Sequence, residues 1–258
     1  MTRVSIVTAV YNRADTIGDA MRSIRAQTHP QIEHIVQDGA STDGTLEVVQ
    51  RFADDRTHVV SAPDGGIYDA LNRGIVRATG DVVGLLHSDD LFAHCDVLAR
   101  VAESFDRSDV DGVYGDLEYV AKGDPSRIIR YWQSGDYHPG KLRQGWMPPH
   151  PTLFLRREVF ERFGAYNTDF RIAADYEAIL RWLTKGQIRL AYIPEVLVKM
   201  RIGGESNRSL ERILRKSRED LRAIRLHNIG GMQVLAAKNL SKITQFLRRD
   251  QNYTASGQ

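Results

Sequence analysis

Apolar and polar residues follow two different periods along the first ninety positions, and the two periods alternate. Residues 4–10, 32–37, 58–61 and 82–86 are short runs that predict strands, and the continuous apolar run at 82–86 is typical of a strand that is buried on both faces of a sheet. The segments between these runs carry apolar residues three or four positions apart, the spacing of an amphipathic helix. This order predicts an α/β fold with a parallel, doubly wound sheet.

The second half of the chain predicts further strands and helices on either side of one long loop. We expect strands at 112–120, 128–132, 152–155, 190–193 and 196–200, and helices at 94–105, 157–163 and 173–185. Residues 134–151 are rich in Gly, Pro, His and Trp and have no clear period, so they predict a long loop, a feature that in compact domains usually serves function or moves. Another loop is expected at 203–207, and a helical segment with a break at 228–231 follows it.

These elements predict one large domain with an appendage. We expect the main domain to span residues 1–207, with its first half at 1–105 and its second half at 106–207. Residues 208–258 are expected to form a helical C-terminal extension. A chain of 258 residues is long enough to bury the core of such a domain.

The composition describes an ordinary globular protein that does not bind nucleic acid. Hydrophobic residues make up 42% of the chain, charged residues make up 26%, and the formal net charge is only +2. Cys95 is the single cysteine, so an internal disulfide is excluded and a reducing compartment is favoured. No run approaches the roughly 18 apolar residues of a membrane span, and the N-terminus lacks a signal pattern. We therefore expect a cytoplasmic protein.

The C-terminal extension mixes apolar and basic residues near helical spacing. The residues concerned are Val234, Leu235, Lys238, Leu240, Lys242, Ile243, Phe246, Leu247, Arg248 and Arg249. Such a helix is typical of peripheral attachment to an anionic membrane, which here would be the inner face of the cell membrane. The alternative is an amphipathic helix that packs on its own domain or on a second subunit of a homo-oligomer.

Polar side chains follow three of the predicted strands at the point where each strand ends. Tyr11 and Asn12 follow the first strand, Asp38 follows the second, and His87, Asp89 and Asp90 follow the strand at 82–86. The carboxyl ends of parallel strands meet at one edge of a sheet, where α/β proteins bind ligands, so we expect these groups to face one crevice. They suit a nucleotide, with one carboxylate for the base or ribose and another for a cation on the diphosphate. For Asp89 and Asp90 the alternative is that they cap the next helix.

Five segments of the first ninety residues, taken in order, resemble the family 2 glycosyltransferases. They are VSIVTAVYN at 4–12, VQDGASTDGT at 36–45, DGGIYDALNRG at 64–74, ATGD at 78–81 and SDD at 88–90. Each segment alone is weak, but the ordered set is specific, and 66–74 is most similar to enzymes that build bacterial exopolysaccharide, capsule or glycolipid sugars. The resemblance implies the GT-A fold, which has a Rossmann-like, mostly parallel mixed sheet flanked by helices. It also implies a nucleotide-sugar donor and a divalent cation, Mn²⁺ or Mg²⁺.

The resemblance also implies roles for residues of the donor side. Asp38 matches the carboxylate that holds the nucleotide base, and Asp89 matches the metal-binding member of the family's Asp-x-Asp motif. His87 stands in place of the first Asp of that motif. Either His87 helps to hold Mn²⁺, or it orders nearby groups while Asp89 alone meets the cation, and we favour the second interpretation. The other candidates for donor binding are Ala9, Tyr11, Asn12, Asp64, Asn72 and Ser88, although helix capping explains Asp64 and Asn72 about as well.

The second half carries the candidates for catalysis and acceptor binding. Asp175 stands where the family has an acidic residue that opens a helix, so the resemblance implies a general base, and a helix cap is the alternative. His150 and Trp146 are expected near the acceptor, against the alternatives of a loop residue without a role and a loop anchor. Arg201 stands near the family's diphosphate-side segment, but we favour a solvated basic face.

Together these features predict an inverting glycosyltransferase that moves a sugar from a nucleoside-diphosphate sugar to a hydroxyl of a glycan or lipid-linked acceptor, in surface polysaccharide or glycolipid synthesis. Two alternatives stay open. A sugar nucleotidyltransferase would need a basic, glycine-rich triphosphate loop, and residues 8–15 offer only Arg13. A non-catalytic nucleotide-sugar-binding or scaffold protein on the same fold is disfavoured by the three carboxylates Asp38, Asp89 and Asp175, but His87 keeps it open.

Overall fold

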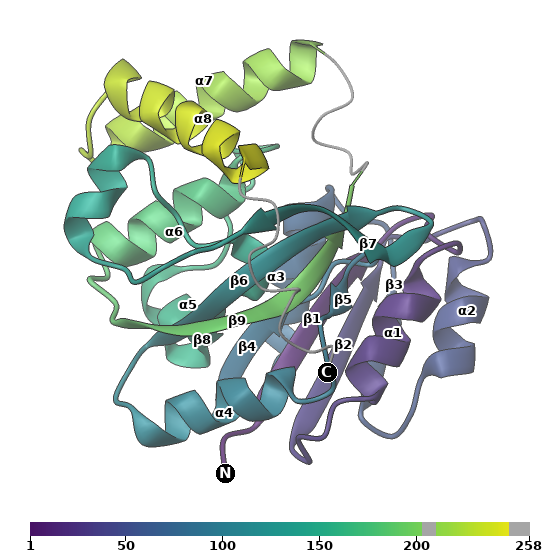
Figure 1. Ribbon diagram of the computed structural model, residues 1–258. Coiled ribbons are helices and arrows are strands. Elements are labelled where there is room, and N and C mark those ends of the chain that lie inside the picture. The colour runs from purple at the N-terminus through teal and green to yellow at the C-terminus, as the bar shows by residue number, and fades with distance from the viewer. Residues whose placement is uncertain (203–209, 248–258) are drawn as a thin grey trace, which may run out of the picture.

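A computed structural model describes residues 1–202 and 210–247 of the chain, and its strands form one mixed sheet (Figure 1). The strands are β1 (Val4–Val10), β2 (Ile32–Asp38), β3 (Thr57–Ser61), β4 (Val82–Leu85), β5 (Leu91–Phe92), β6 (Gly112–Ala121), β7 (Asp124–Trp132), β8 (Phe154–Arg156) and β9 (Leu190–Arg201). The sheet runs in the order β3-β2-β1-β4-β8-β6-β9-β5, and β7 pairs with β6. The pairs β3–β2, β2–β1 and β1–β4 are parallel, as the periodicity predicts, whereas β8 is antiparallel to both of its neighbours.

Helices cover both faces of the sheet, which gives three layers (Figure 1). They are α1 (Ile17–Arg25), α2 (Thr45–Phe52), α3 (Ile67–Arg77), α4 (Val97–Arg107), α5 (Arg157–Phe163), α6 (Ala174–Thr184), α7 (Leu210–Leu226) and α8 (Met232–Leu247), and two 3-10 turns lie at Pro139–Gln144 and His150–Thr152. The apolar stripes of α1, α2 and α4 share one core with one face of the sheet, and those of α3, α5 and α6 share a second core with the other face. The doubly wound architecture predicted from the sequence is therefore confirmed.

The structure differs from the sequence prediction just after β4. Asp90 does not cap a helix, because Leu91 and Phe92 form the short strand β5, which pairs with Lys199 and Val198 of β9. The helix expected from residue 94 begins only at Val97. A strand of two residues has no period of its own, and its pairing with a distant strand overrides local propensity.

Other differences concern the second half. The two strands expected at 190–193 and 196–200 are one continuous strand, β9. The pairing of β9 with β6 shifts register around Asp116, which allows β9 to continue through residues 194 and 195. The long loop at 134–151 contains the 3-10 turn at Pro139–Gln144, and the turn at His150–Thr152 begins at its end. The loop expected at 203–207 lies outside the described residues.

The last two described helices form a hairpin that packs on α6 (Figure 1). Ala223 and Ile224 of α7 and Val234 and Leu235 of α8 are buried in the same core as α6. Lys238, expected on a basic outer face, is instead buried and lies 2.8 Å from Asp220. The side chains of Lys242, Ile243, Phe246, Leu247, Arg248 and Arg249 lie outside the described part of the chain. Over 1–202 and 210–247, every helix is too short or too polar to cross a membrane.

Candidate active site

The loops after β1 and β3 meet at one end of the sheet. The ring of Tyr11 is 58% exposed and lies against Gly39, which directly follows Asp38. A Cβ added at Gly39 would come within 3.3 Å of Tyr11 Cδ2 and within 2.7 Å of Asp64 Oδ2. The absence of a side chain at Gly39 therefore leaves room beside it for the side chains of both Tyr11 and Asp64.

Asp38 and Asn12 shape the loop between them. Asp38 is fully buried and accepts hydrogen bonds of 2.5 Å from the hydroxyls of Ser41 and Ser61. Asn12 adopts a left-handed conformation (φ 50°), and its side-chain oxygen accepts from the Thr42 N–H at 2.9 Å. The side chain of Ala9 is buried in the core below. These contacts hold the loop at 39–42 rigidly against the end of β1.

The loop after β4 brings His87, Ser88, Asp89 and Asp90 to the same end of the sheet, because β4 pairs in parallel with β1. Ser88 and Asp90 are buried, whereas His87 and Asp89 are half-buried. Asp90 accepts a hydrogen bond from the Arg201 N–H at 3.3 Å, and its second oxygen has no partner among the described residues. Burial raises the pKa of Asp90 well above its usual value, with a further increase from the neighbouring Asp89.

Arg201 is buried below this loop, so the expectation of a solvated basic side chain is wrong. Its guanidinium donates to the main-chain oxygen of Asp89 at 3.1 Å, to that of Lys122 at 3.1 Å, and to the carboxylate of Asp19. Only 4% of the residue is exposed. The planar fork of arginine can bind three such acceptors at once. Arg201 thus fixes the main chain that carries Asp89.

Asp175 approaches from the other half of the chain, in the first turn of α6. Its Oδ1 lies 3.3 Å from the hydroxyl of Tyr68, which belongs to α3 and donates a shorter bond of 2.8 Å to Ile172 O. Burial acts to raise the pKa of Asp175, but the electrostatic influence of His150, Lys216 and Lys238 outweighs burial and holds that pKa below its usual value. Asp175 is therefore a carboxylate at neutral pH and can accept a proton.

Two histidines connect Asp175 with the loop after β4. The rings of His87 and His150 have centroids 5.8 Å apart, and His150 Nε2 lies 2.8 Å from the hydroxyl of Tyr166. Burial lowers the pKa of His150 to about 4, so its ring is neutral at pH 7. Burial also lowers the pKa of His87, and the carboxylates of Asp89 and Asp175 both oppose that change. The ring contact with His150 thus links the loop after β4 to the side chain that bonds the Tyr166 hydroxyl.

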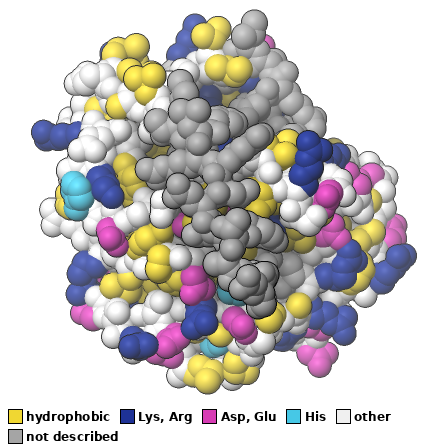
Figure 2. All heavy atoms as spheres, viewed as in Figure 1, with side chains coloured by type: hydrophobic (Ala, Val, Ile, Leu, Met, Phe, Trp, Pro, Cys, Tyr) yellow, Lys and Arg dark blue, Asp and Glu magenta, His cyan; other side chains and the backbone are white. Residues whose placement is uncertain are grey.

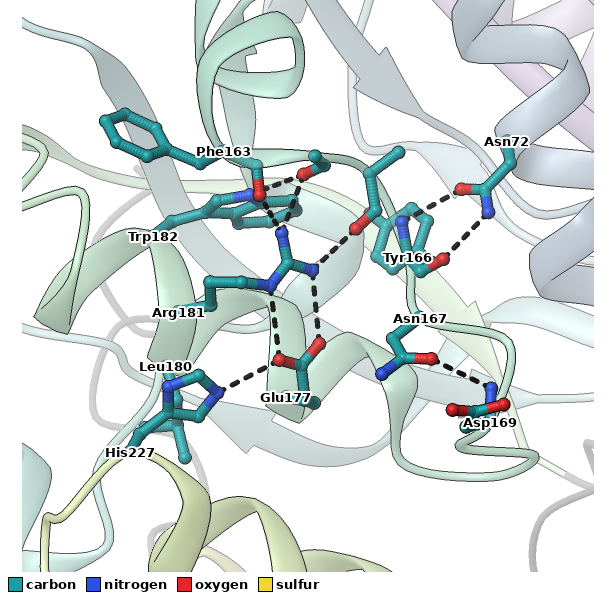
Figure 3. Close-up of polar contacts among 12 residues, drawn as sticks. Asn72, Phe163, Tyr166, Asn167, Asp169, Glu177, Leu180, Arg181, Trp182 and His227 are labelled. Carbon is teal, nitrogen blue, oxygen red and sulfur yellow. Dashed lines mark hydrogen bonds and ion pairs between the residues drawn. The ribbon is translucent and has the colours of Figure 1, made fainter.

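Asn72, which was predicted to bind the nucleotide-sugar donor, instead binds the main chain of Tyr166. Its side chain donates to Tyr166 O at 2.8 Å and accepts from Tyr166 N–H at 2.9 Å (Figure 3). Both ends of the amide are thus bound to one main-chain segment. Figure 3 also shows Arg181 forked between Glu177 and the carbonyl groups at 163–165, with His227 on the far side of Glu177. This network holds the chain that presents the Tyr166 hydroxyl to His150.

Trp146 lies in the long loop among other aromatic residues. Its ring stacks on Tyr137 with centroids 5.3 Å apart and meets the edge of Tyr114 at 5.7 Å. The indole N–H donates to Ser134 O at 2.9 Å. The ring is half-buried, so these contacts fix one part of it and leave another part accessible.

The donor atoms around Asp89 suit a cation that takes few protein ligands. Among residues 1–202 and 210–247, no three His, Cys, Asp or Glu side chains are grouped closely enough to hold a metal ion by themselves. One carboxylate, with or without the His87 imidazole, leaves most positions of an ion to diphosphate oxygens and water, which is how Mg²⁺ commonly binds. A carboxylate with an imidazole fits Mn²⁺ as well.

The sequence did not identify three residues that hold other residues of the site in place. Tyr68 and Tyr166 contact Asp175 and His150 through hydroxyl groups, and Arg201 holds the main chain at Asp89. Tyr68 lies inside the 66–74 motif, which was a usable signal. The partners of Tyr166 and Arg201 lie far away along the chain, so no local pattern marks these two residues.

Comparison with solved structures identifies the fold. A mannosyltransferase from Pyrobaculum calidifontis in complex with GDP-Man and Mn²⁺ superposes with a TM-score of 0.66 at 23% identity, covering 92% of this chain and 69% of that one. The TarS protein of S. aureus in complex with UDP superposes with a TM-score of 0.65 at 18% identity, covering 94% of this chain and 72% of that one. The fold is therefore the GT-A fold expected from the motifs.

Sequence relatives agree with the structural neighbours. An uncharacterized glycosyltransferase of Mycobacterium tuberculosis (strain H37Rv) is 34% identical over 181 residues, or 69% of this chain and 68% of the relative. A PGL/p-HBAD biosynthesis glycosyltransferase of Mycobacterium bovis (strain BCG) is 31% identical over 208 residues, or 79% of this chain and 78% of the relative. Residues 5–164 match the family described as glycosyl transferase family 2. The chain belongs to glycosyl transferase family 2, and the family-level prediction from the sequence is confirmed.

Proposed function

We propose that this glycosyltransferase inverts the anomeric carbon of a nucleoside-diphosphate sugar and that Asp175 is the general base. The observation that carries the proposal is a continuous series of contacts from the loop of Asp89 to Asp175. The His87 ring lies 5.8 Å from the His150 ring, and His150 Nε2 lies 2.8 Å from the Tyr166 hydroxyl. The Tyr166 ring lies 5.6 Å from that of Tyr68, whose hydroxyl lies 3.3 Å from Asp175 Oδ1. A carboxylate for the leaving-group side and an ionised carboxylate for the acceptor side thus lie at one end of the sheet. No described Ser, Cys or carboxylate is needed as a covalent nucleophile in this scheme.

The chemistry balances with one proton transfer. The acceptor hydroxyl gives its proton to the Asp175 carboxylate while its oxygen attacks the anomeric carbon. The bond between that carbon and the diphosphate oxygen breaks, and the nucleoside diphosphate leaves with the electron pair. Attack on the face opposite the leaving group inverts the configuration. The Tyr68 hydroxyl, 3.3 Å from Asp175 Oδ1, orients the carboxylate for this step.

Asp89 is the residue we assign to a divalent cation, and His87 is assigned to ordering its surroundings. When bound, such a cation would stabilise the negative charge that develops on the diphosphate. Arg201 keeps Asp89 in place through its main-chain oxygen. On the donor side, Tyr11, Asp64 and the Asp38 loop form the wall that we assign to the nucleoside.

The acceptor is proposed to be a hydroxyl of a glycan or glycolipid. The half-buried ring of Trp146 offers an apolar face on which a sugar or an aromatic group can stack. His150, held neutral by burial, follows Trp146 in the same loop and lies 2.8 Å from the Tyr166 hydroxyl through Nε2. A relative named for PGL/p-HBAD biosynthesis supports a glycolipid acceptor, and neighbours with GDP-Man or UDP support a nucleotide-sugar donor.

The experiment that tests the catalytic assignment is Asp175→Asn, assayed with the nucleotide sugar that most raises the melting temperature of the wild-type protein. Loss of a general base should lower kcat about 10²- to 10⁴-fold and should leave donor affinity within twofold. Asp169→Asn is the matched control, because this exposed carboxylate lies in the same loop region but outside the site. Transfer by Asp175→Asn at the wild-type rate would remove Asp175 from the role of base.

We also propose that the α7–α8 hairpin meets an anionic membrane. In the upper part of the visible face, where the two helices lie, hydrophobic side chains are exposed beside those of Lys or Arg (Figure 2). Leu214, Leu226, Met232 and Leu240 are among the exposed apolar residues. Arg218, Arg222 and Arg225 line an open hollow of about 600 Å³ with Leu221 and Leu226. Exposed apolar groups beside arginines favour an interface of anionic lipid.

Cosedimentation with phosphatidylglycerol and phosphatidylcholine vesicles tests this location. The double variant Leu226→Ser, Met232→Ser should lose binding to the anionic vesicles. Val76→Ser is the control, since Val76 is exposed and belongs to α3, not to the hairpin. Equal binding by all three proteins would count against this surface.

A further inference from the structure

A carboxylate on α7 binds the main chain directly ahead of the proposed base. Glu219 accepts hydrogen bonds from three successive N–H groups, those of Arg171 at 3.2 Å, Ile172 at 2.8 Å and Ala173 at 2.9 Å. Glu219 is separated from these residues by more than 45 positions in the sequence, so the contact is tertiary. It joins the C-terminal hairpin to the start of α6.

Of these N–H groups, that of Ala173 belongs to the N-terminal end of α6, and those of Arg171 and Ile172 belong to the segment just before it. The first N–H groups of any helix have no partner within the helix, and a side chain at the N-cap usually supplies one. In α6 the N-cap residue is Ala173, which has no side-chain acceptor. Glu219 therefore supplies the acceptor for the N–H of the N-cap residue, as the glutamate of a capping box does, but from another helix. Its negative charge also lies at the positive end of the α6 dipole.

The same peptide unit is held from its other side by the site itself. The Tyr68 hydroxyl donates to Ile172 O at 2.8 Å and lies 3.3 Å from Asp175 Oδ1. In the peptide unit that joins Ile172 to Ala173, the N–H of Ala173 is thus bound by Glu219 of α7, and the carbonyl of Ile172 is bound by Tyr68 of α3. Asp175 is only three residues further on, so its place relative to Tyr68 depends on both contacts.

A second side chain of α7 holds the neighbouring residues. The guanidinium of Arg222 lies 4.5 Å from the ring centroid of Phe170 and contacts Asp169 O at 3.5 Å. Phe170 is fully buried. Arg222 is three residues after Glu219, so both side chains lie on one face of α7. That face therefore binds most of the segment from Asp169 to Ala173.

We propose that Glu219 is a positioning residue for the transfer reaction, which it affects by fixing the α6 N-terminus so that Asp175 is correctly placed. This inference rests on the proposed role of Asp175 as general base. It predicts that loss of Glu219 slows the chemical step and leaves donor binding intact, because the donor wall is assigned to the loops after β1, β2 and β3, whereas Glu219 binds the segment before α6.

The test compares Glu219→Ala and Glu219→Gln with the control Glu211→Ala, an exposed glutamate on the same helix that pairs with Arg215. Rates are normalised to the folded fraction. Glu219→Ala should lower kcat at least tenfold with the donor KM within twofold. Glu219→Gln should retain most of the activity, because one amide oxygen can still accept from Ile172 and Ala173. Hydrogen exchange at the amides of 171–173 should accelerate in the same order.

Two results would overturn the inference. One is a wild-type kcat in Glu219→Ala with faster exchange at 171–173, which would show that the cap does not matter for transfer. The other is a parallel rise in donor KM, which would indicate a general disturbance of the site. Should Glu219→Ala fail to fold, the ratio of kcat between Glu219→Gln and the control, with exchange at 171–173, decides the matter. Asp175→Asn is assayed in parallel. Full activity of Asp175→Asn would overturn both the proposed base and this inference. An inactive Asp175→Asn together with a fully active Glu219→Ala would overturn only the inference.

Discussion

The hydroxyl of Tyr166 lies 2.8 Å from Nε2 of His150, and this bond joins the two sides of the candidate acceptor site. Both residues are buried. Tyr166 is fixed from behind by Asn72, which binds its main chain, and by ring contacts with Tyr68 and Trp182. His150 therefore has a defined ring orientation, although it lies in a 3-10 turn at the end of a long loop.

Tyr166→Phe should destabilise the protein by about 1–3 kcal/mol, because it leaves a buried imidazole nitrogen without a partner. Transfer should slow as His150 loses its fixed orientation. The measurements are urea unfolding and kcat. Tyr176→Phe is the matched control, since the buried Tyr176 hydroxyl has no hydrogen-bond partner among the described residues. A Tyr166→Phe variant as stable as Tyr176→Phe would show that the bond contributes nothing.

The effect of divalent metal on transfer should distinguish the role of Asp89 from that of His87. If Asp89 alone meets the cation, Asp89→Ala should abolish activation by Mn²⁺ and should weaken its binding at least tenfold, whereas His87→Ala should keep Mn²⁺ affinity within about threefold. Removal of divalent ions by EDTA should stop transfer by the wild-type protein. Isothermal titration with Mn²⁺ in the presence of a nucleoside diphosphate measures the affinities. Comparable losses in both variants would make His87 a ligand.

His87→Asp adds a sharper comparison. It restores the acidic residue that the family's motif carries at this position, and carboxylate oxygens are preferred by Mg²⁺ over imidazole. The variant should therefore gain Mg²⁺-supported activity relative to Mn²⁺-supported activity. An unchanged ratio between the two metals would indicate that position 87 does not face the cation.

The stability of the protein should fall on acidification partly because of His34. Burial lowers the pKa of His34 to about 4, whereas the unfolded chain has the ordinary value of about 6.5. Between these values the unfolded state binds a proton that the folded state does not, so stability is lost as pH falls through this window, by up to about 1.4 kcal/mol per pH unit. Above pH 6.5 the ring is neutral in both states and has no such effect.

His34→Gln should therefore lose less stability than the wild type between pH 7 and pH 5, measured by urea unfolding at each pH. The amide can keep a hydrogen bond to the Thr8 hydroxyl, which lies 3.1 Å from the imidazole. His138→Gln is the control, because His138 is exposed. Parallel pH dependences in all three proteins would contradict the assigned cause.

The strand–helix alternation could be predicted because strands that are buried on both faces are largely apolar, as in Val4–Val10 and Val82–Leu85. The ends of the predicted strands then located Tyr11, Asp38 and Asp89 without any knowledge of tertiary contacts. β5 could not be predicted, because Leu91 and Phe92 form a strand only through pairing with β9. The same tertiary contact is what makes Asp90 a buried carboxyl instead of a helix cap.

The charged residues of the C-terminal third were the least predictable. Arg201 and Lys238 stand in a region of frequent basic residues, which normally indicates a solvated face, yet both are buried. Their partners, Asp19 and Asp220, are not marked by any motif. Burial of a charge depends on whether an opposite charge meets it in the folded chain, and a single sequence does not contain that information.

The pair formed by Lys238 and Asp220 gives the last prediction. Their charged atoms lie 2.8 Å apart, both side chains are almost fully buried, and Lys238 Nζ also lies 3.1 Å from the ring centroid of Tyr176 on α6. Lys238→Met should destabilise the protein by about 3–5 kcal/mol, because it leaves the Asp220 carboxylate buried without a partner. The double variant Lys238→Met, Asp220→Leu removes both charges and should recover most of this loss. Urea unfolding of both single variants and the double variant measures the coupling. Additive losses of stability would mean that the two charges do not stabilise each other. If Lys238→Met bound vesicles more weakly but unfolded at the same urea concentration as the wild type, Lys238 would face the membrane, as its sequence context indicated.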